Sequence, residues 1–195
     1  MGTIKTTNIE PIANNGTVTL GSSGDTFTLG SGVVPSNLMN PTFNAVGSAQ
    51  QDLSDATETL VAFASEYFDT DNCFDNTAGN YKFTPNKAGK YFLYFALDAF
   101  SRTDDKIIKA SGRLYKNGTR VNSNIYNLNQ GGSSGVAVHA LPITQGFIVE
   151  ANGSSDYFQV KVYVDVSSGT GPALYADGTS GTSQNTTFGG YRIGS

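Results

Sequence analysis

The chain has 195 residues, and its 12 Lys and Arg against 16 Asp and Glu give a formal net charge of −4. It therefore lacks the basic footprint of a general nucleic-acid-binding protein. Its single cysteine, Cys73, excludes an intrachain disulfide and a multi-cysteine metal site. The 23 glycines, 10 tyrosines and 12 phenylalanines, with few charges, favour an all-β fold with many turns.

The N-terminal residues carry no targeting signal that we recognise. Residues 1–5 (MGTIK) lack the apolar segment of a signal peptide, and no run of 18 apolar residues occurs in the chain. We therefore expect synthesis in the cytoplasm of the producing cell and no insertion into a membrane.

Residues 1–35 differ from the rest of the chain. The sequence TVTLG at 17–21 recurs as TFTLG at 26–30, and in both units threonine alternates with an apolar residue. This period of two is typical of a half-buried strand. Two such short units bury little surface by themselves. We expect the segment to gain order from another copy or a larger surface, and we interpret four apolar residues as its anchor: Val18, Leu20, Phe27 and Leu29.

Residues 36–57, interrupted by Pro41 and Gly47, are interpreted as a linker, and the main domain is expected to begin at residue 58. Asn117-Gly118 predicts a tight hairpin turn, and a Gly/Ser/Thr-rich loop is expected at 167–185. No amphipathic helix of useful length occurs, which excludes α/β enzyme folds. Turn signals separate the expected strands, which are 60–68, 80–84, 90–100, 107–115, 136–141, 146–150, 157–166 and 186–193.

The expected strand at 90–100 is apolar on both faces. Tyr91, Leu93 and Phe95 alternate along it with Phe92 and Tyr94. In a sandwich of two sheets, one such face fills the core and the other can meet a neighbouring subunit. We therefore select seven candidates for the core or a subunit interface: Tyr91, Leu93, Tyr94, Phe95, Phe158, Val160 and Phe188.

Three aspartates, Asp69, Asp71 and Asp75, form the densest group of oxygen ligands in the sequence. Hard oxygen ligands suit Ca²⁺. Their spacing, however, lacks the glycine and the terminal glutamate of an EF-hand loop. Two interpretations stay open, a Ca²⁺ site and a solvated acidic turn, and we expect no other cofactor.

His139 is the only histidine, so a His-based metal cluster is excluded. We interpret it as a packed or interface side chain; near a threefold axis, three copies would form a pH-sensitive element. Residues 131–135 (GGSSG) fit the pattern Gly-x-Ser-x-Gly around Ser133. That motif needs a strand–turn–helix context, whereas a strand is expected to follow here. We therefore expect no enzymatic activity.

The segment 74–94 (FDNTAGNYKFTPNKAGKYFLY) reads as a strand, a Pro-Asn turn closed by glycine, and a long aromatic strand. It resembles the signature of the C1q/TNF-like jelly-roll family, as do 114–118, 135–141 and 188–193. The resemblance covers residues 58–195 and implies a homotrimeric jelly-roll β-sandwich with a binding or structural role. Gln145-Gly146 stands where the family usually has Gly-Asp, and no collagen-like Gly-X-Y stem occurs.

The repeats within residues 3–34 resemble short repeats of tail-fibre and other virion proteins of bacteriophages. This resemblance implies a homotrimeric protein of the virion surface, either a head decoration (cement) protein or a short fibre. Its N-terminal segment would contact the major capsid protein or another virion protein, with the jelly-roll knob outward. Two alternatives stay open: a tail-fibre tip that binds a host receptor or glycan, and a free-standing lectin-like module.

Overall fold

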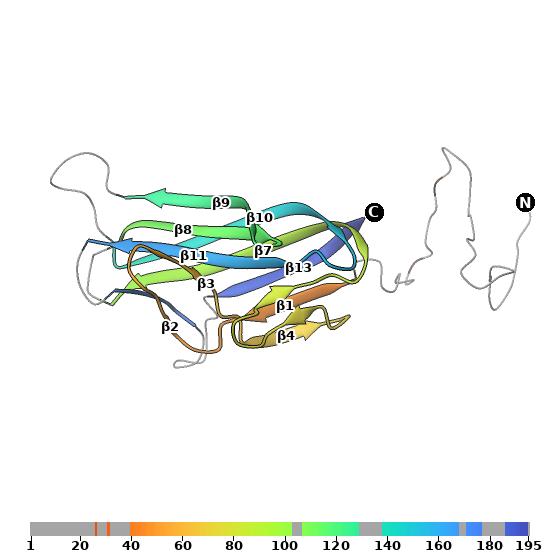
Figure 1. The fold of residues 1–195 in the computed structure, drawn as a ribbon, viewed down its shortest axis with the longest axis horizontal. Coiled ribbons are helices and arrows are strands. Elements are labelled where there is room, and N and C mark those ends of the chain that lie inside the picture. Colours follow the sequence, from red (N-terminus) through yellow and green to blue (C-terminus); the bar gives the residue numbers. More distant parts are fainter. Residues whose placement is uncertain are drawn as a thin grey trace, which may run out of the picture. The chain divides into compact units, whose positions relative to one another are not determined.

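The computed structural model describes residues 26, 31, 40–102, 107–128, 138–167, 171–176 and 186–194. The chain divides into two units, 1–36 and 37–195. The expected anchor residues Val18, Leu20, Phe27 and Leu29 lie outside the described residues. Within the second unit every described element is a strand, and two antiparallel sheets pack as a sandwich (Figure 1). The predicted all-β jelly-roll sandwich is confirmed.

Sheet A is built around the long strand β7. One edge of β7 pairs with β10 over its whole length, and the other edge pairs first with β13 and then with β12. Beyond β13 lie β1 and then β4, while β2 pairs with β12. The seven strands are β1 (Thr42–Val46), β2 (Gln51–Asp52), β4 (Ser65–Asp69), β7 (Ala88–Ser101), β10 (Ala140–Asn152), β12 (Pro172–Leu174) and β13 (Thr187–Gly194).

Sheet B has β11 at its centre. One edge of β11 pairs with β8, which pairs with β9, and the other edge pairs with β3 and β6. The short β5 pairs with β6. The six strands are β3 (Thr57–Leu60), β5 (Phe74–Asp75), β6 (Lys82–Phe83), β8 (Ile107–Lys116), β9 (Thr119–Asn127) and β11 (Phe158–Val166).

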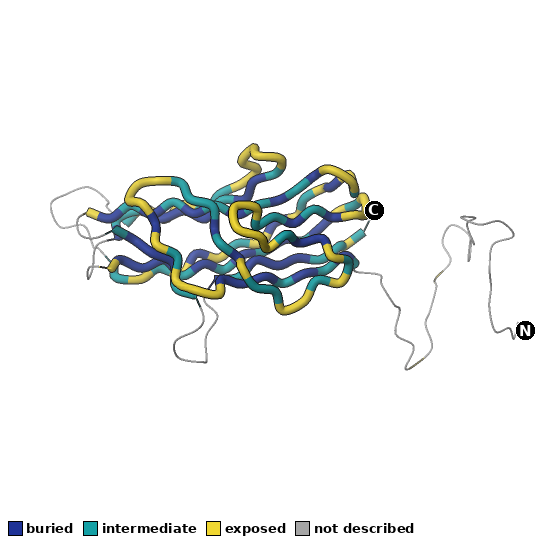
Figure 2. Tube along the Cα trace, turned by 60° about the horizontal axis from the view of Figure 1, so that its bottom comes forward, coloured by how far each residue is buried: buried dark blue, intermediate teal, exposed yellow. Residues whose placement is uncertain are grey.

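The core lies between the facing sides of the two sheets. Alternation along β11 buries its valines and Phe158, as the sequence predicts for the strand 157–166. Figure 2 shows buried segments running through the strands of both sheets, with exposed residues gathered in the connecting turns. Of the seven core or interface candidates, all but Tyr94 lie in this core: Tyr91, Leu93, Phe95, Phe158, Val160 and Phe188.

The sandwich begins earlier than the sequence predicts. The expected linker 36–57 contains β1, which lies inside sheet A between β13 and β4, and also β2. Phe43 of β1 is 1% exposed, and its ring stacks on Phe83 with centroids 4.2 Å apart. Pro41 and Gly47 thus flank a strand of five residues. Only Phe43 and Ala45 alternate into the core, which is too little signal to distinguish such a strand from a linker.

Three other differences have a common cause, because each involves pairing over long sequence distances. The expected strand 60–68 is split into β3 of sheet B and β4 of sheet A, and the apolar Val61 and Phe63 are buried where the chain crosses over. The expected loop 167–185 contains β12, and the expected strand 146–150 is part of a continuous β10. β9, mostly exposed, was not predicted. The Asn117-Gly118 turn is confirmed, with φ of 52° and 77°.

Candidate functional site

The outer side of sheet A carries aromatic rings where a solvated sheet would carry polar side chains. Phe92 and Tyr94 of β7 point away from the core, and the strand register places Ile148 of β10 and Tyr191 of β13 on either side of Phe92. Ile148 is 69% exposed. We call these four residues, Phe92, Tyr94, Ile148 and Tyr191, the aromatic face.

Two glycines allow the rings of this face to lie flat on the sheet. Gly146 and Gly189 are the neighbours of Tyr94 on β10 and β13. A Cβ atom at Gly189 would lie 2.5 Å from the Tyr94 hydroxyl, and one at Gly146 would lie 2.7 Å from Cζ of Phe92. Each ring therefore covers the backbone of an adjacent strand, and the result is a flat apolar platform.

The rings of the aromatic face also support one another. The centroid of the Phe92 ring lies 5.6 Å from that of Tyr191 and 6.3 Å from that of Tyr94. The side-chain amide of Asn44 on β1 donates a hydrogen bond of 2.9 Å to the Tyr94 hydroxyl. These contacts hold large apolar groups in place at the surface, which is typical of a surface that contacts another protein.

A groove lies at the open side of the sandwich, between β9 and β10. In the part of the chain that the structure describes, β9 pairs only with β8 and β10 only with β7, so each strand presents a free edge here. The groove between them has a volume of about 300 Å³. We call it the edge groove; it is lined by Leu114, Val121, Asn122, Gly146, Phe147, Ile148 and Val149.

The outer side of sheet B is polar by contrast. Glu58 of β3 accepts hydrogen bonds from the Tyr115 hydroxyl at 2.6 Å and from Arg113 at 2.5 Å, and Lys161 lies 3.3 Å away. Burial alone would raise the pKa of Glu58, but these hydrogen bonds and the Lys161 charge outweigh it and lower the pKa. The Lys161 ammonium also lies over the Tyr115 ring. Arg113 and Lys161 on this side thus pair with Glu58.

The structure places the three candidate Ca²⁺ ligands in separate local contacts. Asp69 accepts a hydrogen bond of 2.6 Å from the amide of Phe74, and Asp71 pairs with Lys87 at 3.0 Å. Hydrogen bonds from the Thr77 hydroxyl and amide lower the pKa of Asp75. Among the described residues no three His, Cys, Asp or Glu side chains lie close enough to hold a metal. The described geometry therefore brings no set of Ca²⁺ ligands together.

The other singled-out side chains lie apart from one another. His139 immediately precedes β10, and its ring centroid lies 6.2 Å from that of Phe100, which stacks on Tyr175. Cys73 is buried, and burial raises the pKa of its thiol. Ser133 lies outside the described residues, as does the rest of the 131–135 motif. No arrangement of nucleophile and base is therefore seen among the residues that the structure describes.

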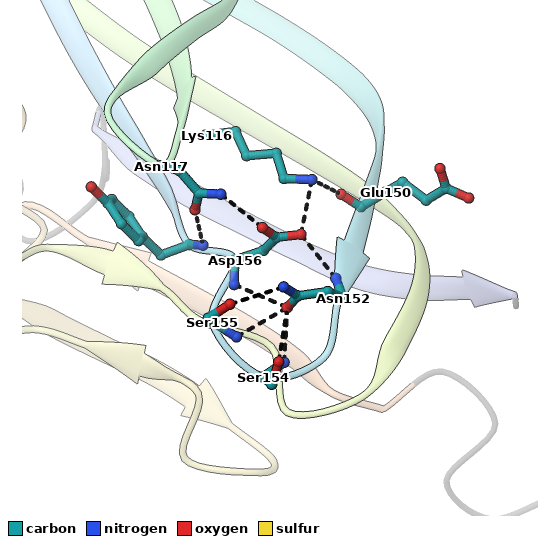
Figure 3. A network of polar contacts seen from close by, with 8 residues as sticks. Lys116, Asn117, Glu150, Asn152, Ser154, Ser155 and Asp156 are labelled. Atoms are coloured by element: carbon teal, nitrogen blue, oxygen red, sulfur yellow. Dashed lines mark hydrogen bonds and ion pairs between the residues drawn. The ribbon is translucent and has the colours of Figure 1, made fainter.

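Sequence reasoning missed a polar network that joins two turns at one end of the sandwich (Figure 3). The carboxylate of Asp156 accepts hydrogen bonds from the Asn117 side chain at 2.7 Å and the Asn152 amide at 2.9 Å, and lies 2.9 Å from the Lys116 ammonium. The Asn152 side-chain oxygen in turn accepts hydrogen bonds from three backbone amides, those of Ser154, Ser155 and Asp156. The sequence NGSSD at 152–156 is the only local signal for such a turn.

This network fixes the β8–β9 and β10–β11 turns to each other. Hydrogen bonds from Lys116 and Asn117 lower the pKa of Asp156. A hollow of about 450 Å³ beside it is lined by Ala88, Gly89, Lys116 and Glu150, among others. The donors and acceptors around Asp156 already bind one another (Figure 3), so the network acts as a structural clamp.

Comparisons with known proteins identify solved structures of similar fold but no match to the sequence. No family model and no curated protein matches the sequence. Two solved structures that match are crystal structures of murine APRIL at pH 8.0 and at pH 5.0, which are 12% and 11% identical to the chain. Each has a TM-score of 0.52 and covers 78% of this chain and 98% of its own. The fold is a TNF-like jelly roll. At this level of identity the likeness shows the fold alone.

Proposed function

We propose that the chain is a homotrimeric structural protein in which the aromatic face of one copy packs against the edge groove of the next. The observation that carries this proposal is the aromatic face itself. Ile148 is 69% exposed in a single copy, and the half-buried rings of Phe92, Tyr94 and Tyr191 are held in fixed positions by ring contacts and by the Asn44 hydrogen bond. An exposed, ordered apolar surface on a β-sandwich is best explained by a partner that covers it.

Two different surfaces, the aromatic face and the edge groove, favour a cyclic arrangement. When a patch on one copy binds a different patch on the next, the contact is head-to-tail and closes into a ring if the rotation permits. The aromatic face and the edge groove are two such patches, and Ile148 belongs to both. We expect three copies in the ring because of the resemblance to C1q/TNF-like domains. The paired charges on sheet B leave that side as the solvated surface.

We further propose that the trimer belongs to a bacteriophage virion, as a head decoration protein or a short fibre, with residues 1–36 as the attachment to the particle. The support is the resemblance of the repeats in residues 3–34 to those of virion proteins, together with the division of the chain at residue 36. Two alternative roles would involve the same trimer: a tail-fibre tip that binds a host receptor or glycan, and a free lectin-like module. We propose no enzymatic role.

Light scattering tests the assembly. The full chain, with a protomer mass of 20.5 kDa, is expected to have about three times that mass in solution. A fragment of residues 37–195, which retains β1, is expected to give a trimer as well. Ile148→Glu places a charge on the aromatic face and should yield folded monomers. Ile125→Glu, at a side chain 53% exposed on the outer side of sheet B, is the matched control and should stay trimeric.

Either of two results would contradict the assembly proposal: a monomer for the unmodified chain, or a trimer that tolerates Ile148→Glu. The virion setting needs a separate experiment. Virus particles from the source of the sequence should contain peptides of this protein, detected by mass spectrometry. The purified full chain, 1–195, should sediment with particles from which the protein has been removed, whereas the fragment 37–195 should not. Saturable binding to a glycan array, with no copies on particles, would favour the lectin-like alternative.

A further inference from the structure

The aromatic face ends in a carboxylate. Asp98 lies on β7 with the same orientation as Phe92 and Tyr94, since all three occupy even positions of one regular strand. Its neighbour across the sheet on β10 is Pro142, and on the other side its backbone carbonyl accepts a hydrogen bond of 2.9 Å from the amide of Tyr175. Asp98 therefore lies on the same side of sheet A as the aromatic face, next to it along β7.

The surroundings of Asp98 offer its charge little compensation. The side chain is half-buried, and among the described residues its carboxylate has neither a hydrogen bond nor an ion pair. Burial raises the pKa of this carboxyl. At the other end of the same face, by contrast, Glu150 stands opposite Lys90 in the register of β10 and β7.

The titratable groups on the neighbouring elements are few. On the same side of β7 they are Lys90, Tyr94 and, past the end of the strand, Arg102, which pairs with Asp52 of β2 at 2.9 Å. Tyr175 follows β12, and His139 precedes β10; both contact Phe100, two positions along β7 from Asp98. On β13 the nearest residue of the face in the register is the neutral Thr187.

We propose that Asp98 makes assembly through the aromatic face pH-dependent, so that the copies associate more tightly as this carboxyl takes up a proton. The inference rests on the proposed function, because it needs the aromatic face to be covered by another copy. Taking an ionised carboxylate out of water without a partner is costly, whereas the protonated form costs much less. Covering the face should therefore favour the protonated form further.

The sign of the effect follows from proton linkage. Asp98 binds a proton more tightly in the assembly than in the free copy, so assembly takes up protons and is favoured as the pH falls. Between the two pKa values, the association constant changes by up to about tenfold per pH unit for each carboxyl involved. A cation supplied to Asp98 by the neighbouring copy would give the opposite sign, and so would burial of His139 in the contact.

The experiment is a concentration series of the full chain followed by sedimentation at pH 5.5, 6.5 and 7.5. The dissociation constant of the unmodified protein should rise with pH. Asp98→Asn, which is neutral and of the same shape, should assemble at pH 7.5 at least about tenfold more tightly than the unmodified chain and lose the pH dependence. Glu150→Gln, on the same strand pair, should retain it, and His139→Ala separates any contribution of the imidazole.

Each other result has a definite meaning. A pH dependence that survives in Asp98→Asn, or tighter assembly at higher pH, overturns the inference and leaves the assembly proposal intact. Assembly that is equally tight at every pH also overturns the inference and leaves the assembly proposal intact. If association is too tight for dilution, the urea concentration that dissociates the trimer replaces the dissociation constant. A monomer at every pH overturns the proposed function and this inference together.

Discussion

The side-chain amide of Asn44 reaches the hydroxyl of Tyr94 at 2.9 Å although a whole strand separates them. Asn44 lies on β1 and Tyr94 on β7, with β13 between them, and Gly189 of β13 is the neighbour of both in the strand register. The Tyr94 ring can cross β13 only because Gly189 has no side chain. One glycine thus allows a half-buried ring on the outer side of the sheet to be held from both ends.

Gly189→Ala should displace this ring. The added methyl group would lie within 2.6 Å of the ring carbon Cζ of Tyr94, so the ring must swing away and give up the Asn44 hydrogen bond. We expect a loss of about 1–2 kcal/mol in the free energy of unfolding, measured with urea, and weaker trimers. Gly194→Ala is the matched control on the same strand, because nothing lies within 4 Å of its added carbon. Equal effects of both variants would contradict the explanation.

Phe43→Ala tests whether β1 is part of the sandwich. The ring of Phe43 stacks on Phe83 and Phe74 and meets Phe188 edge-on, with centroids 4.2–5.2 Å apart. Removing a buried phenylalanine costs about 3–5 kcal/mol, and thermal or urea unfolding should show this loss. Phe68→Ala, at a side chain 49% exposed on the adjacent β4, should cost less than about 1 kcal/mol. A small effect at Phe43 would return residues 42–46 to the expected linker.

Asp156→Ala should loosen the end of the sandwich shown in Figure 3. The change leaves the Asn117 side chain, the Asn152 amide and the Lys116 ammonium without their shared acceptor. At neutral pH we expect a loss of about 2–3 kcal/mol in the free energy of unfolding.

The pH dependence of that loss has a definite sign. The pKa of Asp156 is lower in the folded protein than in the unfolded chain, so its stabilising effect is present above the unfolded-state pKa. It should disappear as the pH falls below about 4, through the folded-state pKa. Urea unfolding of both proteins from pH 7 to pH 2.5 measures this convergence. Glu150→Gln, an exposed carboxylate nearby, should show no such convergence.

Tyr91 should not ionise in the folded protein until strongly alkaline pH. Burial raises its pKa to about 12, and its hydroxyl donates a hydrogen bond of 2.6 Å to the carbonyl of Lys87. The unfolded chain ionises near pH 10, so the stabilising contribution of neutral Tyr91 is present below that pH and is lost above it. Ultraviolet absorbance titration should show a tyrosine that ionises near pH 12 and is missing in Tyr91→Phe. Tyr67→Phe, at an exposed position, is the control and should leave the Tyr91 signal in place.

Much of the sandwich could be read from local patterns. Alternation along 157–166 identifies the buried face of β11, and Asn117-Gly118 identifies the turn that joins β8 to β9. The aromatic strand at 90–100 correctly predicts an apolar outer side on β7, because successive side chains of a strand point to opposite faces whatever the strand pairs with. These features depend only on the backbone of neighbouring residues.

The tertiary structure alone decided which strands meet. Val61 and Phe63 look like the middle of one strand, yet the chain changes sheets there. No local pattern shows that Gly189 lies beneath Tyr94, because that relationship follows from strand register over a long sequence distance. By itself, the sequence determined the alternation of the strands at 90–100 and 157–166 and the position of the Asn117-Gly118 turn. The surfaces that we propose to act in assembly were decided by pairing between distant segments, since a strand's register is set by the partners it finds in the folded chain.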